Sequence, residues 1–267
     1  MTRSIRAGMG LGDALYLQAI VRHLVDHQAL RVCTAYPDVF RPHQGRIELA
    51  PFTRQGINIL AHYTTRKSVV GTDQFEDCCI TAGIHEPVDL VIDWQREEGG
   101  PAAEVQRIAA GRRVVLVQLP RSPMGRKDGF GHELLPDCRV IQRLIDRVKG
   151  ECLVVQVGAG APLFKFSGIE VDLRDRTTVP QLLDVASIAA GFLGYVSFFV
   201  PLAESFKRPA LLVWSKLQRR ANTAFIRQIT PQKILHRESS KHVVDDWTED
   251  RIALALADFL AAVRLPK

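Results

Sequence analysis

The chain has 267 residues, of which 46% are hydrophobic and 24% charged, so the composition excludes a disordered chain and the length predicts two compact domains. Most of the net charge of +6 comes from two segments: residues 107–149 hold ten Lys and Arg against four acids, and residues 205–241 hold nine against one. Such basic segments concentrate anionic ligands, whether nucleotide diphosphates, phosphorylated glycans or nucleic acid, without choosing among them.

In the first half, short apolar runs alternate with amphipathic stretches, which is typical of β-α units around a parallel sheet. A strand is predicted at residues 4–7, followed by a glycine-rich turn at 8–12 and a helix over 13–26. The remaining elements expected here are strands at 30–35, 57–63 and 88–92 and a helix over 73–82. The polar stretch 95–103 reads as a linker, so we expect domains at 1–98 and 99–267.

The second half repeats the pattern and predicts a second parallel sheet. Strands are expected at 114–119, 152–157, 169–173, 192–196 and 210–214, and helices over 138–149, 180–190, 202–206 and from Thr248 onward. The C-terminal helix carries an apolar stripe made of Ile252, Leu256, Phe259, Leu260 and Val263. Both halves therefore indicate an α/β protein with two Rossmann-like domains.

Several features bear on the compartment. Residues 185–203 are uncharged and long enough to cross a bilayer, but Gly191, Gly194 and Pro201 divide them into a helix end, a buried strand and a helix start. The N-terminus has no pattern of a cleaved signal peptide. The cysteines are odd in number and lack the C-x-x-C spacing, so we expect reduced thiols in a cytoplasm; they are Cys33, Cys78, Cys79, Cys138 and Cys152.

The first candidate motif is G-M-G-L-G-D at residues 8–13, a glycine turn that opens a helix after a strand. Gly10 and Gly12 would let the backbone approach an anion at the helix N-terminus, so we predict that they contact the donor. Asp13 has two readings: an ordinary helix cap, or a general base that accepts the proton of an attacking hydroxyl.

The second candidate is the basic loop that follows the strand ending near Gln118. In open α/β sheets ligands bind outside the carboxyl ends of the strands, so Arg121, Arg126 and Lys127 are placed where a diphosphate would lie. These cations would stabilise a leaving diphosphate without a metal ion. Gly158, which follows the next strand, joins Gln118 in the predicted donor site.

The third candidate is the run G-Y-V-S-F-F-V-P-L-A-E at residues 194–204, which ends in K-R-P at 207–209. It resembles the segment G-N-D-S-G-P-M-H-L-A-A-A-L-G-K-P of bacterial heptosyltransferase-like glycosyltransferases (family 9, fold type B). The matching residues are Gly194, Ser197, Leu202, Ala203 and Pro209. The Gly12-Asp13 start is similar to the S-x-G-D start of that family, and the segment V-D-L-R-D-R-T-T at 171–178 also resembles it.

This resemblance implies a GT-B fold, two Rossmann-like domains facing across a cleft, and a glycosyltransferase that uses a nucleotide sugar as co-substrate and needs no other cofactor. It carries the role of catalytic base onto Asp13 and donor binding onto Ser197 and the basic loop with Arg126 and Lys127. Inverting transfer of a hexosyl or heptosyl group, without a metal, is expected. The pattern departs from the family at Val196, Phe198 and Pro201, so a non-catalytic nucleotide-binding module is an alternative.

The acceptor has two candidates. One is a glycan or lipid-linked sugar. The other is DNA with hydroxymethylated pyrimidines, as for glycosyltransferases of bacterial viruses, in which case the compartment would be the host cytoplasm; the basic segments and short chain motivate it. Tyr63, Arg66 and Lys67 form an aromatic and basic cluster that we expect to contact the acceptor. His23 and His27 have the i, i+4 spacing of metal ligands but no third ligand nearby, so no metal site is predicted.

Overall fold

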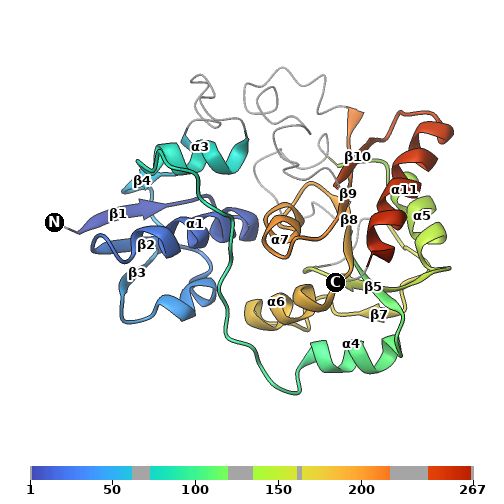
Figure 1. Cartoon of the computed structure of the whole chain (residues 1–267), viewed down its shortest axis with the longest axis horizontal. Coiled ribbons are helices and arrows are strands. Elements are labelled where there is room, and N and C mark those ends of the chain that lie inside the picture. The colour runs from blue at the N-terminus through green and yellow to red at the C-terminus, as the bar shows by residue number, and fades with distance from the viewer. Residues whose placement is uncertain (1, 62–72, 120–134, 161–163, 217–239, 266–267) are drawn as a thin grey trace. The chain divides into compact units, whose positions relative to one another are not determined.

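The computed structural model describes residues 2–61, 73–119, 135–160, 164–216 and 240–265 (Figure 1). The chain divides into two compact units. The first unit contains the described residues up to Gln95 together with Val200–Ser205, and the second contains the rest. A helix of the second half, α7 (Phe199–Ser205), thus contributes most of its residues to the first unit.

The first unit is built on a four-stranded parallel sheet with the order β3-β2-β1-β4. The strands are β1 (Arg3–Arg6), β2 (Leu30–Thr34), β3 (Ile47–Pro51) and β4 (Ile57–Asn58). The helices are α1 (Leu11–Leu24), the 3-10 helix η1 (Pro37–His43) and α3 (Gln74–Thr81). Neither η1 nor β3 was expected, and the strand predicted at 57–63 is paired over two residues.

The strand predicted at residues 88–92 is wrong. Leu90 and Ile92 are buried, which explains the apolar alternation, but the segment joins no sheet. Its backbone bonds to side chains instead: Ile92 N–H donates to Ser205 Oγ at 3.0 Å, and the buried Gln18 amide bonds both the N–H and the C=O of Asp93. Side-chain amides and hydroxyls can form the hydrogen bonds to an extended backbone that a neighbouring strand would otherwise form.

The second unit has six parallel strands in the order β10-β9-β8-β5-β6-β7. This is the Rossmann order 3-2-1-4-5-6, and the chain direction along the sheet reverses between β5 and β8. The strands are β5 (Arg113–Gln118), β6 (Cys152–Val157), β7 (Val171–Asp172), β8 (Gly191–Tyr195), β9 (Ala210–Trp214) and β10 (Lys241–Val244). The strand β10 was missed, whereas the bounds of β6 and β9 match the prediction.

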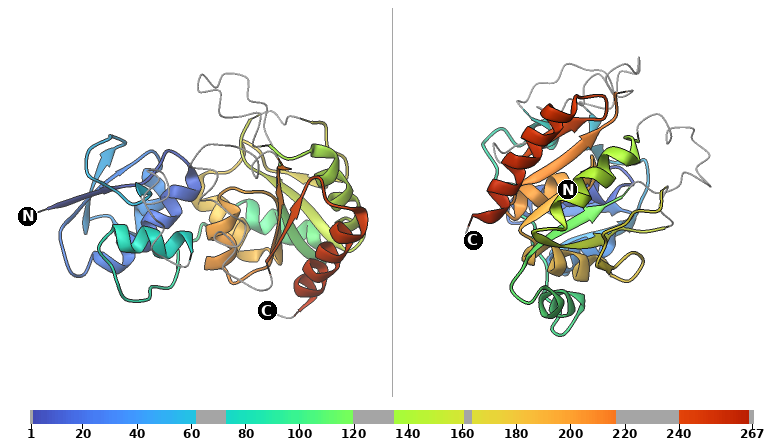
Figure 2. Two further views of the ribbon diagram at one scale, coloured as in Figure 1. Left: turned by 90° about the horizontal axis from the view of Figure 1, so that it is seen from above. Right: turned by 90° about the vertical axis from the view of Figure 1, so that its right-hand side faces the viewer.

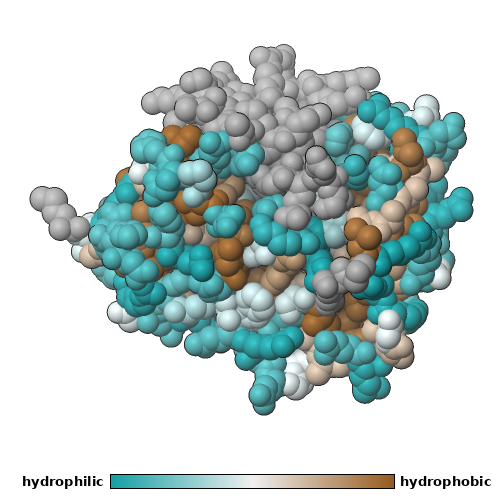
Figure 3. All heavy atoms as spheres, viewed as in Figure 1, coloured by the Kyte–Doolittle hydropathy of each residue, from teal (hydrophilic) through white to brown (hydrophobic). Residues whose placement is uncertain are grey.

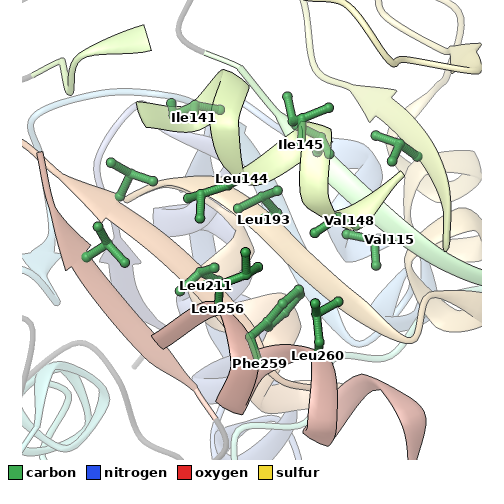
Figure 4. Packing of buried hydrophobic residues seen from close by; sticks show 14 of the residues in the cluster. Val115, Ile141, Leu144, Ile145, Val148, Leu193, Leu211, Leu256, Phe259 and Leu260 are labelled. Atoms are coloured by element: carbon green, nitrogen blue, oxygen red, sulfur yellow. The ribbon is translucent and has the colours of Figure 1, made fainter. Parts of the chain in front are cut away.

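The core of the second unit lies where α5 (Cys138–Val148) and α11 (Glu249–Arg264) cover one face of the sheet (Figures 2 and 4). Ile141, Leu144 and Ile145 of α5 are buried in one cluster with Leu193 and Phe259. The stripe expected on the C-terminal helix is thus confirmed as its buried face.

Two further helices, α4 (Pro101–Ala109) and α6 (Val179–Ile188), pack against each other in the second unit. The helix α4 begins inside the stretch read as a linker, because Pro101 suits the first position of a helix. The α6 helix starts with a reciprocal pair of bonds between Thr178 and Gln181.

Hydrophilic residues cover most of the described surface on the face drawn in Figure 3. Within the described ranges, no helix combines the length and the apolar character that a membrane span requires.

Candidate functional site

The Asp13 carboxylate lies in the first turn of α1, directly beyond the carboxyl end of β1. The helix begins at Leu11 with Gly10 as its N-cap, so Asp13 is the third helical residue, two positions further into the helix than predicted. Asp13 Oδ2 accepts a hydrogen bond from the Gly10 backbone N–H at 3.2 Å. This bond is the reach-back half of a capping box, so Asp13 has a role in the helix start itself.

Partial burial gives this carboxylate an unusual pKa. It raises the pKa of Asp13 from 3.8 to about 6, and the hydrogen bond from Gly10 opposes the shift only in part. Burial disfavours the charged form because the surrounding protein solvates a carboxylate less well than water does. A carboxylate with such a pKa is ionised at neutral pH and is a stronger base than an exposed aspartate.

Gly8 provides the space for the carboxylate. A Cβ atom on Gly8 would lie 2.1 Å from Asp13 Oδ2 and 3.2 Å from Leu60 Cδ1. A Cβ on Gly10 would lie 3.2 Å from the same oxygen. A larger residue at position 8 would therefore force the Asp13 carboxylate to move.

Tyr16 follows Asp13 by one turn, and its ring stacks on Phe75 of α3 with centroids 5.8 Å apart. Its side chain is buried, and its hydroxyl has no hydrogen-bond partner among the residues that the structure describes. Burial and the charges of Cys78, Asp73 and Asp13 raise the pKa of Tyr16 well above 10. Sequence reasoning missed this tyrosine, because the helical spacing that places it beside Asp13 is also that of an ordinary core residue.

In the second unit, Gln118 ends β5 at the point where the strand order reverses. It pairs with Val157 of β6 on one side and with Gly194 of β8 on the other. A Cβ on Gly194 would lie 2.5 Å from the Gln118 carbonyl oxygen, so the two backbones touch. Gln118 Oε1 is buried and has no partner within the described ranges, while Nε2 reaches the Tyr195 hydroxyl at 3.5 Å.

The glycine loop after β6 lies beside Gln118. Gly158 has a φ of +117°, and its Cβ would lie 3.8 Å from Gln118 Cγ. Asp175 holds this loop: its carboxylate accepts the Gly160 N–H at 2.9 Å, and its own N–H donates to the Gly158 carbonyl. Sequence reasoning missed Asp175, whose one signal was its place just after a predicted strand.

Ser197 follows β8 by two residues, and its Oγ accepts the Phe199 N–H at 3.3 Å as α7 begins. The structure thus brings Gln118 and Gly158 together, and it places Ser197 beyond the adjacent strand β8. Carboxyl ends of strands at such a reversal are where ligands bind in open α/β sheets.

Six predicted site residues lie outside the described part of the chain: Tyr63, Arg66, Lys67, Arg121, Arg126 and Lys127. Gly12 lies in the first turn of α1, where backbone N–H groups have no intrahelical partner. The His23 and His27 rings are 6.1 Å apart, and His23 bonds to Glu86 at 2.8 Å. In the described ranges, no group of three or more His, Cys, Asp or Glu is arranged to hold a metal ion.

No protein family model and no curated protein matches the sequence. Solved structures do match. The E. coli ADP-heptose lps heptosyltransferase II is similar at 12% identity with a TM-score of 0.52, covering 98% of each chain. The E. coli heptosyltransferase WaaC with ADP gives 10% identity and a TM-score of 0.54, covering 98% of this chain and 99% of the other.

A glycosyl transferase family 9 structure from Veillonella parvula gives 10% identity and a TM-score of 0.55, covering 99% of this chain and 90% of the other. Identities this low show the fold alone. The strand order of the second unit agrees with them, and the chain therefore has the GT-B fold with two Rossmann-like domains.

Proposed function

We propose that this chain is a glycosyltransferase that moves a sugar from a nucleotide-sugar donor to an acceptor hydroxyl. The observation that carries the proposal is the partly buried Asp13 carboxylate, whose pKa, raised by this burial to about 6, suits a general base, within a GT-B fold. The expected location is the cytoplasm, and the five cysteines, which are all free thiols, agree with a reducing compartment.

The proposed reaction is a single displacement. The acceptor hydroxyl gives its proton to the Asp13 carboxylate, and its oxygen forms a bond to the anomeric carbon of the sugar. The bond from that carbon to the diphosphate oxygen breaks, and the nucleoside diphosphate leaves with the electron pair. Attack from the side opposite the leaving group inverts the anomeric configuration.

Donor binding is assigned to the carboxyl edge of the six-stranded sheet. Gly194 lets two backbones touch there, Gly158 supplies a turn with a positive φ, and Gln118 and Ser197 supply polar groups. We propose that Arg121, Arg126 and Lys127 neutralise the leaving diphosphate, which removes the need for a metal ion. Gly10 and Gly12 add the N-terminus of α1 as a further anion contact.

For the acceptor we propose a glycan or lipid-linked sugar, contacted by Tyr63, Arg66 and Lys67. The heptosyltransferase II that this chain resembles is named for ADP-heptose and for lps, which favours a sugar acceptor. The argument for DNA rests on the basic segments alone, and such segments serve any anionic ligand.

The test is a panel of nucleotide sugars offered to the wild type and to Asp13→Asn. Thermal shift reports donor binding, because a ligand that binds the folded state raises its stability. Turnover is followed as release of nucleoside diphosphate. Asp13→Asn should lose about 10²- to 10⁴-fold in turnover, the usual contribution of a general base, and keep the donor-induced shift.

Asp250→Asn is the matched control, since Asp250 is an exposed acid in the first turn of α11. It should keep full turnover. Unchanged turnover in Asp13→Asn would refute the base assignment. A wild type that binds a donor and never turns it over, alone or with a glycan acceptor, would instead support the non-catalytic module.

A further inference from the structure

Four arginines gather at the edge of the six-stranded sheet opposite the strand ends assigned to the donor. Two of them have carboxylate partners: Arg112 bonds to Glu170 at 2.7 Å, and Arg264 bonds to Glu151 at 2.6 Å. Arg113, at the start of β5, donates to the Arg264 backbone carbonyl at 3.2 Å. The fourth, Arg208, precedes β9 by two residues.

Arg208 and Arg113 differ from the other two because no acid in the described part of the chain pairs with either. The Arg208 side chain is partly buried, and its buried Nε has no hydrogen-bond acceptor among the described residues. A buried charged donor without an acceptor is costly, and such groups are rare in folded proteins.

The strand register brings these two arginines near each other. Val115 of β5 pairs with Gly191 of β8, and Phe192 N–H bonds to the Pro209 carbonyl. One strand therefore separates their backbones, a span of about 10 Å that two arginine side chains can close. Their proximity also has an electrostatic effect, since burial and then the charge of Arg113 lower the pKa of Arg208.

The backbone before Arg208 is strained. Lys207 has a φ of +54°, a left-handed conformation that residues other than glycine adopt at a cost. The heptosyltransferase-like pattern has Gly at this position. Retained strain of this kind is a reason to look for a function at the neighbouring side chain.

We propose that Arg113 and Arg208 form a binding site for a phosphate group at the amino-terminal edge of the six-stranded sheet. A guanidinium group bonds oxyanions through two parallel N–H donors, and a phosphate has enough oxygens to bond two such groups from different directions. The anion would supply the acceptor that Arg208 Nε lacks and would offset the repulsion between the two cations. The proposal is independent of the assigned transferase activity, because it concerns the opposite edge of the sheet.

The test is an NMR titration of the arginine Nε–Hε signals with inorganic phosphate. The Arg208 signal is assigned by its absence from Arg208→Gln. It should move with saturating behaviour in the wild type, and at least tenfold more phosphate should be needed in Arg113→Gln. Arg112→Gln, which removes a paired arginine at the same edge, should leave the titration unchanged.

Phosphate bound at the donor site would leave the Arg208 signal in place, so the readout is specific. A wild-type Arg208 signal that does not move up to millimolar phosphate, or one that moves equally in Arg113→Gln, would overturn the proposal. A second experiment, binding to vesicles containing phosphatidic acid, separates a lipid phosphate from a free one. If the phosphate belongs to a lipid, Arg208→Lys, which keeps the charge but loses the paired N–H donors, should bind the vesicles as weakly as Arg208→Gln. If the wild type and all variants bind the vesicles equally while the phosphate titration saturates, the ligand is a free phosphate.

Discussion

The carboxyl edges of the two sheets are built in different ways. In the first unit the edge presents the Asp13 carboxylate, whose pKa is raised by burial and whose position depends on the missing side chain of Gly8. In the second unit the edge is shaped by backbone contact between Gly194 and Gln118 and by the turn at Gly158. A proton-accepting group needs surroundings that set its pKa, whereas an edge that binds phosphate needs accessible backbone N–H groups. The separate roles proposed for the two units follow this difference.

Gly194→Ala tests the backbone contact between Gly194 and Gln118 in the second unit, and it should have the largest effect on stability. The added Cβ would lie 2.5 Å from the Gln118 carbonyl oxygen, and the two paired strands cannot move apart without weakening their hydrogen bonds. We expect a loss of about 1–3 kcal/mol in the free energy of unfolding, measured by urea denaturation. Gly150→Ala, whose added Cβ would lie 3.6 Å from the Arg147 carbonyl oxygen, should change the free energy of unfolding by less than about 0.5 kcal/mol. Equal effects of the two substitutions would contradict the close contact.

Gly8→Ala tests whether the position of the Asp13 carboxylate in the first unit depends on the space at Gly8. The new methyl group must displace the Asp13 carboxylate, so turnover should fall by roughly 10- to 100-fold, as expected for a catalytic group misplaced by about 1 Å. Stability should change little, since the displaced atom belongs to a side chain. Gly10→Ala is the graded control, because its Cβ would lie 3.2 Å from the same oxygen and should cost less turnover. Full activity in Gly8→Ala would separate Asp13 from the chemistry.

Lys207→Gly should have the smallest effect and the opposite sign. Glycine adopts a φ of +54° without a steric penalty, so the free energy of unfolding should rise by about 1 kcal/mol. Ala261→Gly places the same residue on the exposed face of α11, where it should lower stability by about 1 kcal/mol. Thermal and urea unfolding of both variants would measure these changes in stability. A loss of stability in Lys207→Gly would contradict the claim that the backbone at Lys207 is strained.

Much of the second unit was predictable because its strands are continuous apolar runs. The strands β6 and β9 are buried along their whole length, and such runs are typical of a parallel sheet. The start of α11 after Thr248 was equally clear from Glu249 and Asp250 in its first turn.

The features that the sequence did not reveal depend on contacts between residues that lie far apart in the sequence. The segment around Ile92 has the alternation of a strand, but its backbone is satisfied by Ser205 and Gln18. The sequence singled out Asp13 by its place after a glycine turn, whereas its raised pKa depends on burial that no local pattern shows. That no described acid pairs with Arg208 likewise depends on which acids the fold brings to Arg112 and Arg264.

The pH dependence of kcat/KM tests the central claim most directly, because it reports the pKa of the base in the free enzyme. Asp13 must be deprotonated to accept a proton, so the rate should be constant from pH 7 to 8 and fall tenfold per pH unit below about 6. The residual rate of Asp13→Asn should lack this acidic limb. A wild-type rate that stays constant down to pH 4.5, or an acidic limb retained in Asp13→Asn, would contradict the account.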